Sequence, residues 1–225
     1  MQVKMLLAIL LTSVVQASYL GMPECNLDPW QPKVSVLYGW ESLSIDGFSA
    51  TEVDAEHVTA LVEVGVISDR LSVFAGGSFG DAEVDGYGEA ANLDDAWLAG
   101  LRYTIWTNGT WTVGGTSVVQ QYAQDVSIQL AGKPFTTGLD VISYMSSLGV
   151  ERDFGALSVY AGGYFQYLDG EQFLEWGTFR KEAEVSETDI GAYGGVSYQI
   201  GPVDLTAELQ IGDGTSGFLG AGFTF

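Results

Sequence analysis

The clearest pattern in the chain is Val203-Asp-Leu-Thr-Ala-Glu-Leu-Gln-Ile211. Every second residue in it is apolar, and the residues between are Asp, Thr, Glu and Gln. Successive side chains of a β-strand point to opposite faces of the sheet, so this period of two predicts a strand with one apolar and one polar face. The same alternation occurs at residues 58–66 and 190–198.

Similar alternation covers most of the chain after residue 32. It predicts about ten strands, at residues 33–41, 57–67, 71–79, 96–106, 111–121, 139–150, 156–167, 189–200, 203–211 and 217–225. These strands are longer than those of soluble sheets, most of which have about five or six residues. They match the roughly 9 to 11 residues that a tilted strand needs to cross a hydrocarbon layer.

The connections between these strands alternate in length. Tight turns are expected at residues 68–70, 107–110, 151–155 and 201–202, and longer polar loops at 42–56, 80–95, 122–140 and 168–188, with a shorter one at 212–216. Short turns at one rim and long loops at the other are typical of membrane barrels. The predicted fold class is therefore all-β: a closed antiparallel up-and-down transmembrane β-barrel of about ten strands, with eight as the alternative count.

The first residues have the pattern of a secretory signal peptide. Lys4 precedes an apolar run from Met5 to Val15, and Val15-Gln16-Ala17 forms a small-residue cleavage site. A membrane anchor is the alternative, but the run is shorter than the roughly 18 residues that a spanning helix needs. We expect a signal peptide at residues 1–17, a short periplasmic segment at 18–32 and the barrel at 33–225.

Composition excludes several classes of function. The chain has 225 residues, of which 29 are acidic and 8 are Lys or Arg, for a formal net charge of −21. Such a charge argues against nucleic acid as a partner, because nucleic-acid binding depends on Lys and Arg contacts to phosphate. Cys25 is the only cysteine, which excludes a disulfide framework and multi-cysteine metal sites.

The carboxyl end carries a resemblance to known proteins. The chain ends Gly217-Phe-Leu-Gly-Ala-Gly-Phe-Thr-Phe225, with Phe223 and Phe225 on one face. This resembles the terminal signal by which bacterial outer-membrane barrels are recognised. With the signal peptide and the alternating loops, the chain resembles small outer-membrane β-barrel proteins of the porin-like and opacity-protein kind. The resemblance implies a bacterial outer-membrane location, with membrane lipid and the barrel-assembly machinery as partners.

Three charged residues fall near the middle of predicted strands, on polar faces: Glu63, Arg102 and Glu208. If those faces line the lumen, the charges must pair or stay hydrated. We expect Arg102 to pair with one or both acids and to help fill a narrow lumen. The alternative is a narrow pathway that prefers cations.

Two further constellations are candidates for chemistry. Asp81, Glu83 and Asp85 alternate before Gly86, as at the start of a calcium loop, but Asn92 stands where such a loop carries a bidentate Glu. A solvated loop is the alternative. His57 follows Asp54 and Glu56, which makes a carboxylate-oriented base conceivable. No glycine-flanked serine elbow accompanies it, so a solvated histidine at the rim is expected.

These observations predict a protein without catalytic activity and without a cofactor, calcium being the one candidate ion. The leading hypothesis is an outer-membrane barrel with a structural or surface-interaction role, in which acidic extracellular loops meet an external partner whose identity the sequence leaves open. One alternative is a small passive porin-like channel. Another is a secreted soluble β-barrel that binds an apolar ligand and has its apolar faces turned inward.

Overall fold

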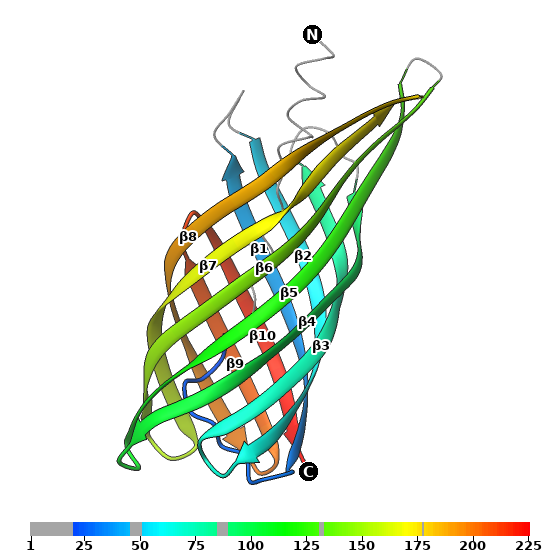
Figure 1. Ribbon diagram of the computed structural model, residues 1–225. Coiled ribbons are helices and arrows are strands. Elements are labelled where there is room, and N and C mark those ends of the chain that lie inside the picture. Colours follow the sequence, from blue (N-terminus) through cyan, green and yellow to red (C-terminus); the bar gives the residue numbers. More distant parts are fainter. Residues whose placement is uncertain (1–19, 46–50, 85–89, 131–132, 177) are drawn as a thin grey trace.

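Ten antiparallel strands form one closed barrel (Figure 1). The computed structural model describes residues 20–45, 51–84, 90–130, 133–176 and 178–225. The strands are β1 (Pro32–Ile45), β2 (Thr51–Ile67), β3 (Leu71–Val84), β4 (Ala90–Thr107), β5 (Trp111–Leu130), β6 (Lys133–Asp153), β7 (Leu157–Trp176), β8 (Phe179–Ile200), β9 (Val203–Ile211) and β10 (Gly214–Thr224). Each strand pairs with its neighbours in sequence, and β1 pairs with β10 to close the ring. The predicted fold class is confirmed, with ten strands.

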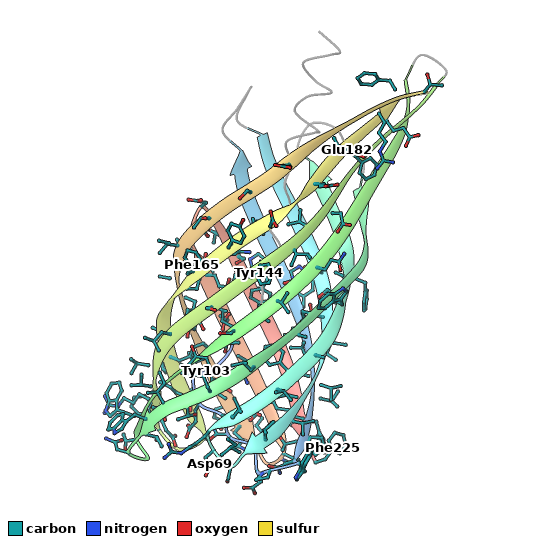
Figure 2. All side chains as sticks on the ribbon, in the orientation of Figure 1. Asp69, Tyr103, Tyr144, Phe165, Glu182 and Phe225 are labelled. Atoms are coloured by element: carbon teal, nitrogen blue, oxygen red, sulfur yellow. The ribbon has the colours of Figure 1, made fainter. Side chains whose placement is uncertain are left out.

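Tight turns join the strands at one end of the barrel. Gly109, Gly155 and Gly201 adopt positive φ angles in three of these turns, and Asp69 does so in the fourth. Asp69 and the terminal Phe225 both lie at this end (Figure 2). Within the described ranges no helix is long and apolar enough to cross a bilayer.

At the other end of the barrel the strands extend farther than the sequence predicts. The loops expected at residues 42–56, 80–95, 122–140 and 168–188 are wrong over most of their length, because the flanking strands continue into all four of these ranges. Of these strands, β5, β6, β7 and β8 rise past the others (Figure 1). We call this part of β5–β8 the extended sheet. Beyond a membrane both faces of a sheet can meet water, so the extended sheet needs no apolar face and periodicity does not detect it.

The outer face of the barrel is apolar, and its charged mid-strand residues point into the lumen. Val62, Leu205 and Leu209 are 51%, 43% and 46% exposed, whereas Glu63, Arg102 and Glu208 point inward and are buried. This reverses the arrangement of a soluble protein and suits a wall in contact with lipid. The alternative of a soluble barrel with inward apolar faces is therefore wrong.

Aromatic side chains mark both edges of the outer apolar band. Trp106, Trp111 and Phe154 are exposed near the tight turns, and the guanidinium of Arg152 lies 5.0 Å from the ring centre of Trp111. Toward the other end Trp40 and Trp97 are exposed as well. Aromatic belts of this kind lie at membrane interfaces.

Candidate functional site in the barrel lumen

The lumen holds the chain's own N-terminal segment, residues 20–31, which we call the plug segment. It runs from the start of β1 at the tight-turn end into the barrel, where Figure 1 shows it in dark blue. Leu20 and Cys25 are completely buried, and Leu27 is nearly so. The sequence predicts a short periplasmic segment at residues 18–32, ahead of the barrel, whereas residues 20–31 lie inside the barrel.

The base of the plug segment pairs with β2. Trp30 N–H donates to the Gly65 carbonyl over 2.8 Å, and Gly65 N–H donates to the Gln31 carbonyl over 3.2 Å. A Cβ atom on Gly65 would lie 2.2 Å from the Asp28 carbonyl oxygen and 2.9 Å from that of Leu27. Only glycine at position 65 lets the plug segment approach the wall this closely.

The middle of the plug segment is held by side chains of the wall. Cys25 N–H donates to Thr104 Oγ1 over 3.0 Å, and Glu24 N–H donates to Glu151 Oε2 over 3.1 Å. An extended segment inside a barrel has no sheet partner for these donors, so wall side chains satisfy them.

Glu208 binds the inner end of the plug segment. Its carboxylate accepts hydrogen bonds from Leu20 N–H over 3.1 Å and from Gly21 N–H over 2.9 Å. Gly21 has a φ of 71°, a conformation suited to glycine. The Tyr160 hydroxyl and the Gln210 amide also donate to Glu208, over 3.0 and 2.8 Å. These donors compensate for burying the carboxylate.

Leu20 completes an apolar layer across the lumen. This layer contains side chains from each of β1 to β8, namely Leu37, Leu61, Phe74, Leu98, Val118, Met145, Tyr160, Tyr164 and Tyr193. Leu20 is the member contributed by the plug segment, and Met22 packs against the layer. The plug segment and the wall together therefore fill the lumen at this level with apolar side chains.

Of the three predicted lumen charges, two pair with each other and the third binds the plug segment. Arg102 Nη1 lies 3.0 and 2.9 Å from the two carboxylate oxygens of Glu63, and Ser72 also donates to Glu63. Arg102 and Glu63 thus form a buried ion pair. The carboxylate of Glu208 binds the plug segment instead.

A cavity of about 540 Å³ lies beside the plug segment at the tight-turn end. Its lining includes Gly155, Gly201 and Pro202 from the turns, and the charged residues Glu24, Lys33, Glu63, Arg102, Asp153 and Asp204. Lys33 Nζ lies 2.7 Å from Asp204 Oδ2. Partial burial raises the pKa of Glu24, Asp153 and Asp69 raise it further, and a hydrogen bond with Asn26 opposes the shift.

The calcium candidates lie outside the described side chains. The backbones of Asp81 and Glu83 belong to β3, but their side chains are not among those described, and Asp85 falls outside the described residues. Among the side chains that the structure does describe, no group of three or more His, Cys, Asp or Glu is placed to hold a metal ion.

His57 is not a solvated rim residue, and that expectation is wrong. Its side chain is only 3% exposed, points into the lumen and meets the edge of the Phe218 ring at 5.7 Å between ring centres. The neighbouring Glu56 is exposed on the opposite face of β2, because adjacent strand residues point in opposite directions. Glu56 therefore does not orient the His57 imidazole.

Sequence reasoning missed the plug segment and its wall partners Thr104, Glu151 and Gly65. The one available signal is a short alternation in which Gly21, Pro23, Cys25 and Leu27 are the buried members. Such a pattern indicates extended chain, but it does not distinguish a strand of the wall from a segment inside the barrel.

Comparison with known proteins identifies the fold. No protein-family model matches the chain, and no curated protein sequence does. Among solved structures, the translocator domain of autotransporter NalP from Neisseria meningitidis is 13% identical, with a TM-score of 0.55 over 88% of this chain and 90% of that one.

Two other barrels give similar values. An outer-membrane channel of Pseudomonas putida F1 is 12% identical, with a TM-score of 0.53 over 93% of this chain and 100% of that chain. The outer-membrane protease OmpT from Escherichia coli is 11% identical, with a TM-score of 0.51 over 93% of this chain and 99% of that one. This chain therefore has the fold of the bacterial outer-membrane β-barrels, as its terminal sequence and alternating loops predicted.

Proposed function

We propose that this chain is a non-catalytic barrel of the bacterial outer membrane that presents an acidic sheet to cations or to a basic partner outside the cell. The observation that carries the proposal is a row of carboxylates in the extended sheet. Asp140 of β6 pairs with Glu171 of β7, which in turn pairs with Glu184 of β8.

Residues directly opposite each other in a sheet share a face, so these three carboxylates form one line, which we call the acidic row. All three are exposed, and Asp169 lies on the same face. Like charges placed directly opposite each other destabilise a sheet. A cationic ligand would relieve that repulsion, which supports an interaction role.

The only ion pair described in this region lies farther along the sheet. Arg180 Nε lies 2.8 Å from Glu182 Oε1, with the Arg180 guanidinium over the Phe173 ring. Glu182 is near the tip of the extended sheet (Figure 2). Arg180 is therefore engaged with Glu182, beyond the acidic row.

The acidic row begins beside the aromatic belt. Trp97 Nε1 donates to Gln121 Oε1 over 2.9 Å, and Gln121 Nε2 donates to Asp140 Oδ1 over 3.1 Å. This chain of contacts connects an interfacial tryptophan to the first acid of the row. Because surface fields act over about 8 to 10 Å at physiological salt, the acidic row would attract cations close to the lipid head groups.

Two features of the lumen support a role without catalysis and without a permanently open pore. The only histidine is buried beside Phe218 rather than paired with Glu56. The plug segment and the apolar layer fill the centre of the barrel. We therefore place the proposed interaction on the outer surface of the molecule.

A fluorescent oligolysine peptide is a suitable probe for the acidic row. We expect it to bind the barrel in zwitterionic detergent, and to bind more weakly as NaCl rises. The triple variant Asp140→Asn/Glu171→Gln/Glu184→Gln should weaken binding and flatten the salt dependence. Equal binding by this variant and the unaltered barrel would contradict the role of the acidic row.

The candidate calcium loop provides a control with the same change in charge. The triple variant Asp81→Asn/Glu83→Gln/Asp85→Asn should leave oligolysine binding much less affected. We also propose calcium as a ligand of Asp81, Glu83 and Asp85. If so, millimolar calcium should raise the melting temperature of the unaltered barrel, and the loop variant should lose that response while the acidic-row variant keeps it.

A further inference from the structure

We propose that residues 20–31 are a removable plug, and that the barrel conducts small cations when this segment leaves the lumen. This activity does not depend on the acidic row, which lies outside the barrel.

The plug segment is held mainly by hydrogen bonds that water can replace. Its N–H groups bind Thr104, Glu151 and Glu208, all of which belong to the wall. The Thr116 hydroxyl donates to the Leu20 carbonyl over 2.7 Å. Since each partner is a polar side chain facing the lumen, the surface left behind would be wettable.

The wall also has a recess that fits this segment. A Cβ atom on Gly114 would lie 2.2 Å from the Pro23 carbonyl oxygen, and one on Gly65 would lie 2.2 Å from that of Asp28. The strands pair with one another through their own ladders, and the plug segment is not one of the paired strands of the ring. Withdrawal therefore leaves the barrel intact and a groove along its inner wall.

Withdrawal also opens the apolar layer. Leu20 is completely buried within it and belongs to the plug segment, not to a strand of the wall. The remaining members are fixed on strands. Loss of Leu20, together with the backbone of residues 20–25, would connect the region above the layer with the 540 Å³ cavity below it.

The charges beside this passage favour cations. Glu208 would lose two N–H donors and Glu151 would lose one, which leaves two carboxylates facing water in the passage. The pairs Arg102–Glu63 and Lys33–Asp204 are each neutral overall. Ten strands leave a lumen only slightly wider than one that side chains fill, so the permeant ions must be small.

Cys25 reports on the position of the plug segment. It is the only cysteine in the chain and is completely buried, so a thiol reagent reaches it only when the segment moves. We expect slow labelling of the folded barrel. The substitution Gly65→Ala should raise the rate about fivefold to tenfold, as expected when roughly one buried hydrogen bond is lost.

Gly77→Ala is the matched control for that substitution. A Cβ atom there meets only the Ala96 carbonyl oxygen, at an ordinary 3.5 Å. Its labelling rate should equal that of the unaltered barrel. Equal rates for the Gly65→Ala and Gly77→Ala variants, both verified as folded barrels, would overturn the proposed mobility of the plug segment.

A reversible lock tests conduction within one protein. Cys25 N–H contacts Thr104, so the substitution Thr104→Cys offers a partner for a disulfide between the plug segment and β4. In planar bilayers, the Gly65→Ala barrel should conduct. The Gly65→Ala/Thr104→Cys barrel should be silent when mass spectrometry shows the bond and should conduct after reduction. If the oxidised and reduced forms of the Gly65→Ala/Thr104→Cys barrel conducted equally, the pathway would lie elsewhere and the proposal would be overturned.

Glu208→Gln tests the selectivity. In the Gly65→Ala barrel, a potassium chloride gradient should give a reversal potential of the sign expected for cations, and adding Glu208→Gln should move it toward zero. A reversal potential already at zero, or unchanged by Glu208→Gln, would overturn cation selection by that carboxylate. Oligolysine binding should be the same in all these variants, so the two proposals fail independently.

Discussion

Arg102 and Glu63 form the central ion pair of the lumen. Both side chains are about nine-tenths buried, and both Glu63 oxygens face one guanidinium nitrogen. Removing one partner leaves an unpaired buried charge, so Arg102→Met should lower the free energy of unfolding by about 3 to 5 kcal/mol. Urea titration of the barrel in lipid vesicles measures this change.

The double variant Glu63→Gln/Arg102→Met is the control for that substitution. It removes both charges while keeping an acceptor for Ser72, so most of the lost stability should return. A double variant as unstable as the single variant would show that Arg102 acts through packing on Phe74 rather than through its charge.

Glu24 makes docking of the plug segment depend on pH. Partial burial raises its pKa, Asp153 of β6 and Asp69 of the β2–β3 turn raise it further, and a hydrogen bond with Asn26 of its own segment opposes the shift. Glu151 of β6 also faces it and accepts a hydrogen bond from the Glu24 N–H. Since the docked state holds the proton more tightly than the released state, docking is strongest below the ordinary carboxyl pKa. It weakens as pH rises through the raised pKa of Glu24.

Cys25 labelling between about pH 4 and pH 8 checks this dependence, with each rate divided by that of the unfolded chain to remove thiol ionisation. The normalised rate should increase with pH, and Glu24→Gln should remove most of the increase. A normalised rate that falls with pH would contradict the assigned direction.

In the strand β9, the alternation of apolar and polar residues determines which side chains face lipid and which face the lumen. Leu205 and Leu209 point outward, while Glu208 and Gln210 are buried in the lumen. A positive charge in the apolar band is costly, so Leu209→Arg should destabilise the barrel by about 2 to 4 kcal/mol. Ile211→Arg, two residues nearer the end of the strand, should cost only about 0 to 1 kcal/mol if that end reaches the interface. Urea titration of both variants in the same vesicles compares them.

The sequence predicts the membrane part of each strand better than the rest. Lipid on one side and the lumen on the other impose a period of two, so β9 matches its predicted bounds of 203–211. The sequence predicts loops in the place of the extended sheet, because residues such as Asp169 and Glu171 lie where both faces of a sheet can be polar. The plug segment was missed because its partners, such as Thr104 and Glu208, are far from it in sequence.

For the candidate site, too, the sequence predicts one property and not another: it predicts which side chains point inward, but not which partners they bind. Inward positions for Glu63, Arg102 and Glu208 follow from strand periodicity alone. The partner of each charge depends on strand tilt and register, which fix distances across the lumen and are not encoded locally. Arg102 could therefore be expected to pair with an acid, whereas the role of Glu208 in binding Leu20 and Gly21 required coordinates.

At the scale of the whole molecule, Phe225 links closure of the barrel to its proposed assembly. Its N–H donates to the Pro32 carbonyl over 3.1 Å, while its ring is 67% exposed and contacts Phe223. Because the ring contributes little to packing, deleting Phe225 should leave the melting temperature of refolded barrel nearly unchanged and sharply lower its amount in outer membranes.

Phe154→Ala, which removes another exposed aromatic side chain at the same end, is the control for surface loss. It should leave the amount in the membrane close to normal. Normal membrane levels after deletion of Phe225 would contradict its role as an assembly signal.

In β9, one alternation separates the lipid face of the barrel from its lumen. Spin labels placed singly at residues 204–211, in a Cys25→Ser background, test it through collisions with oxygen in lipid vesicles. We expect a period of two, with high oxygen accessibility at 205 and 209 and low accessibility at 208 and 210. The opposite phase, or no period at all, would contradict it.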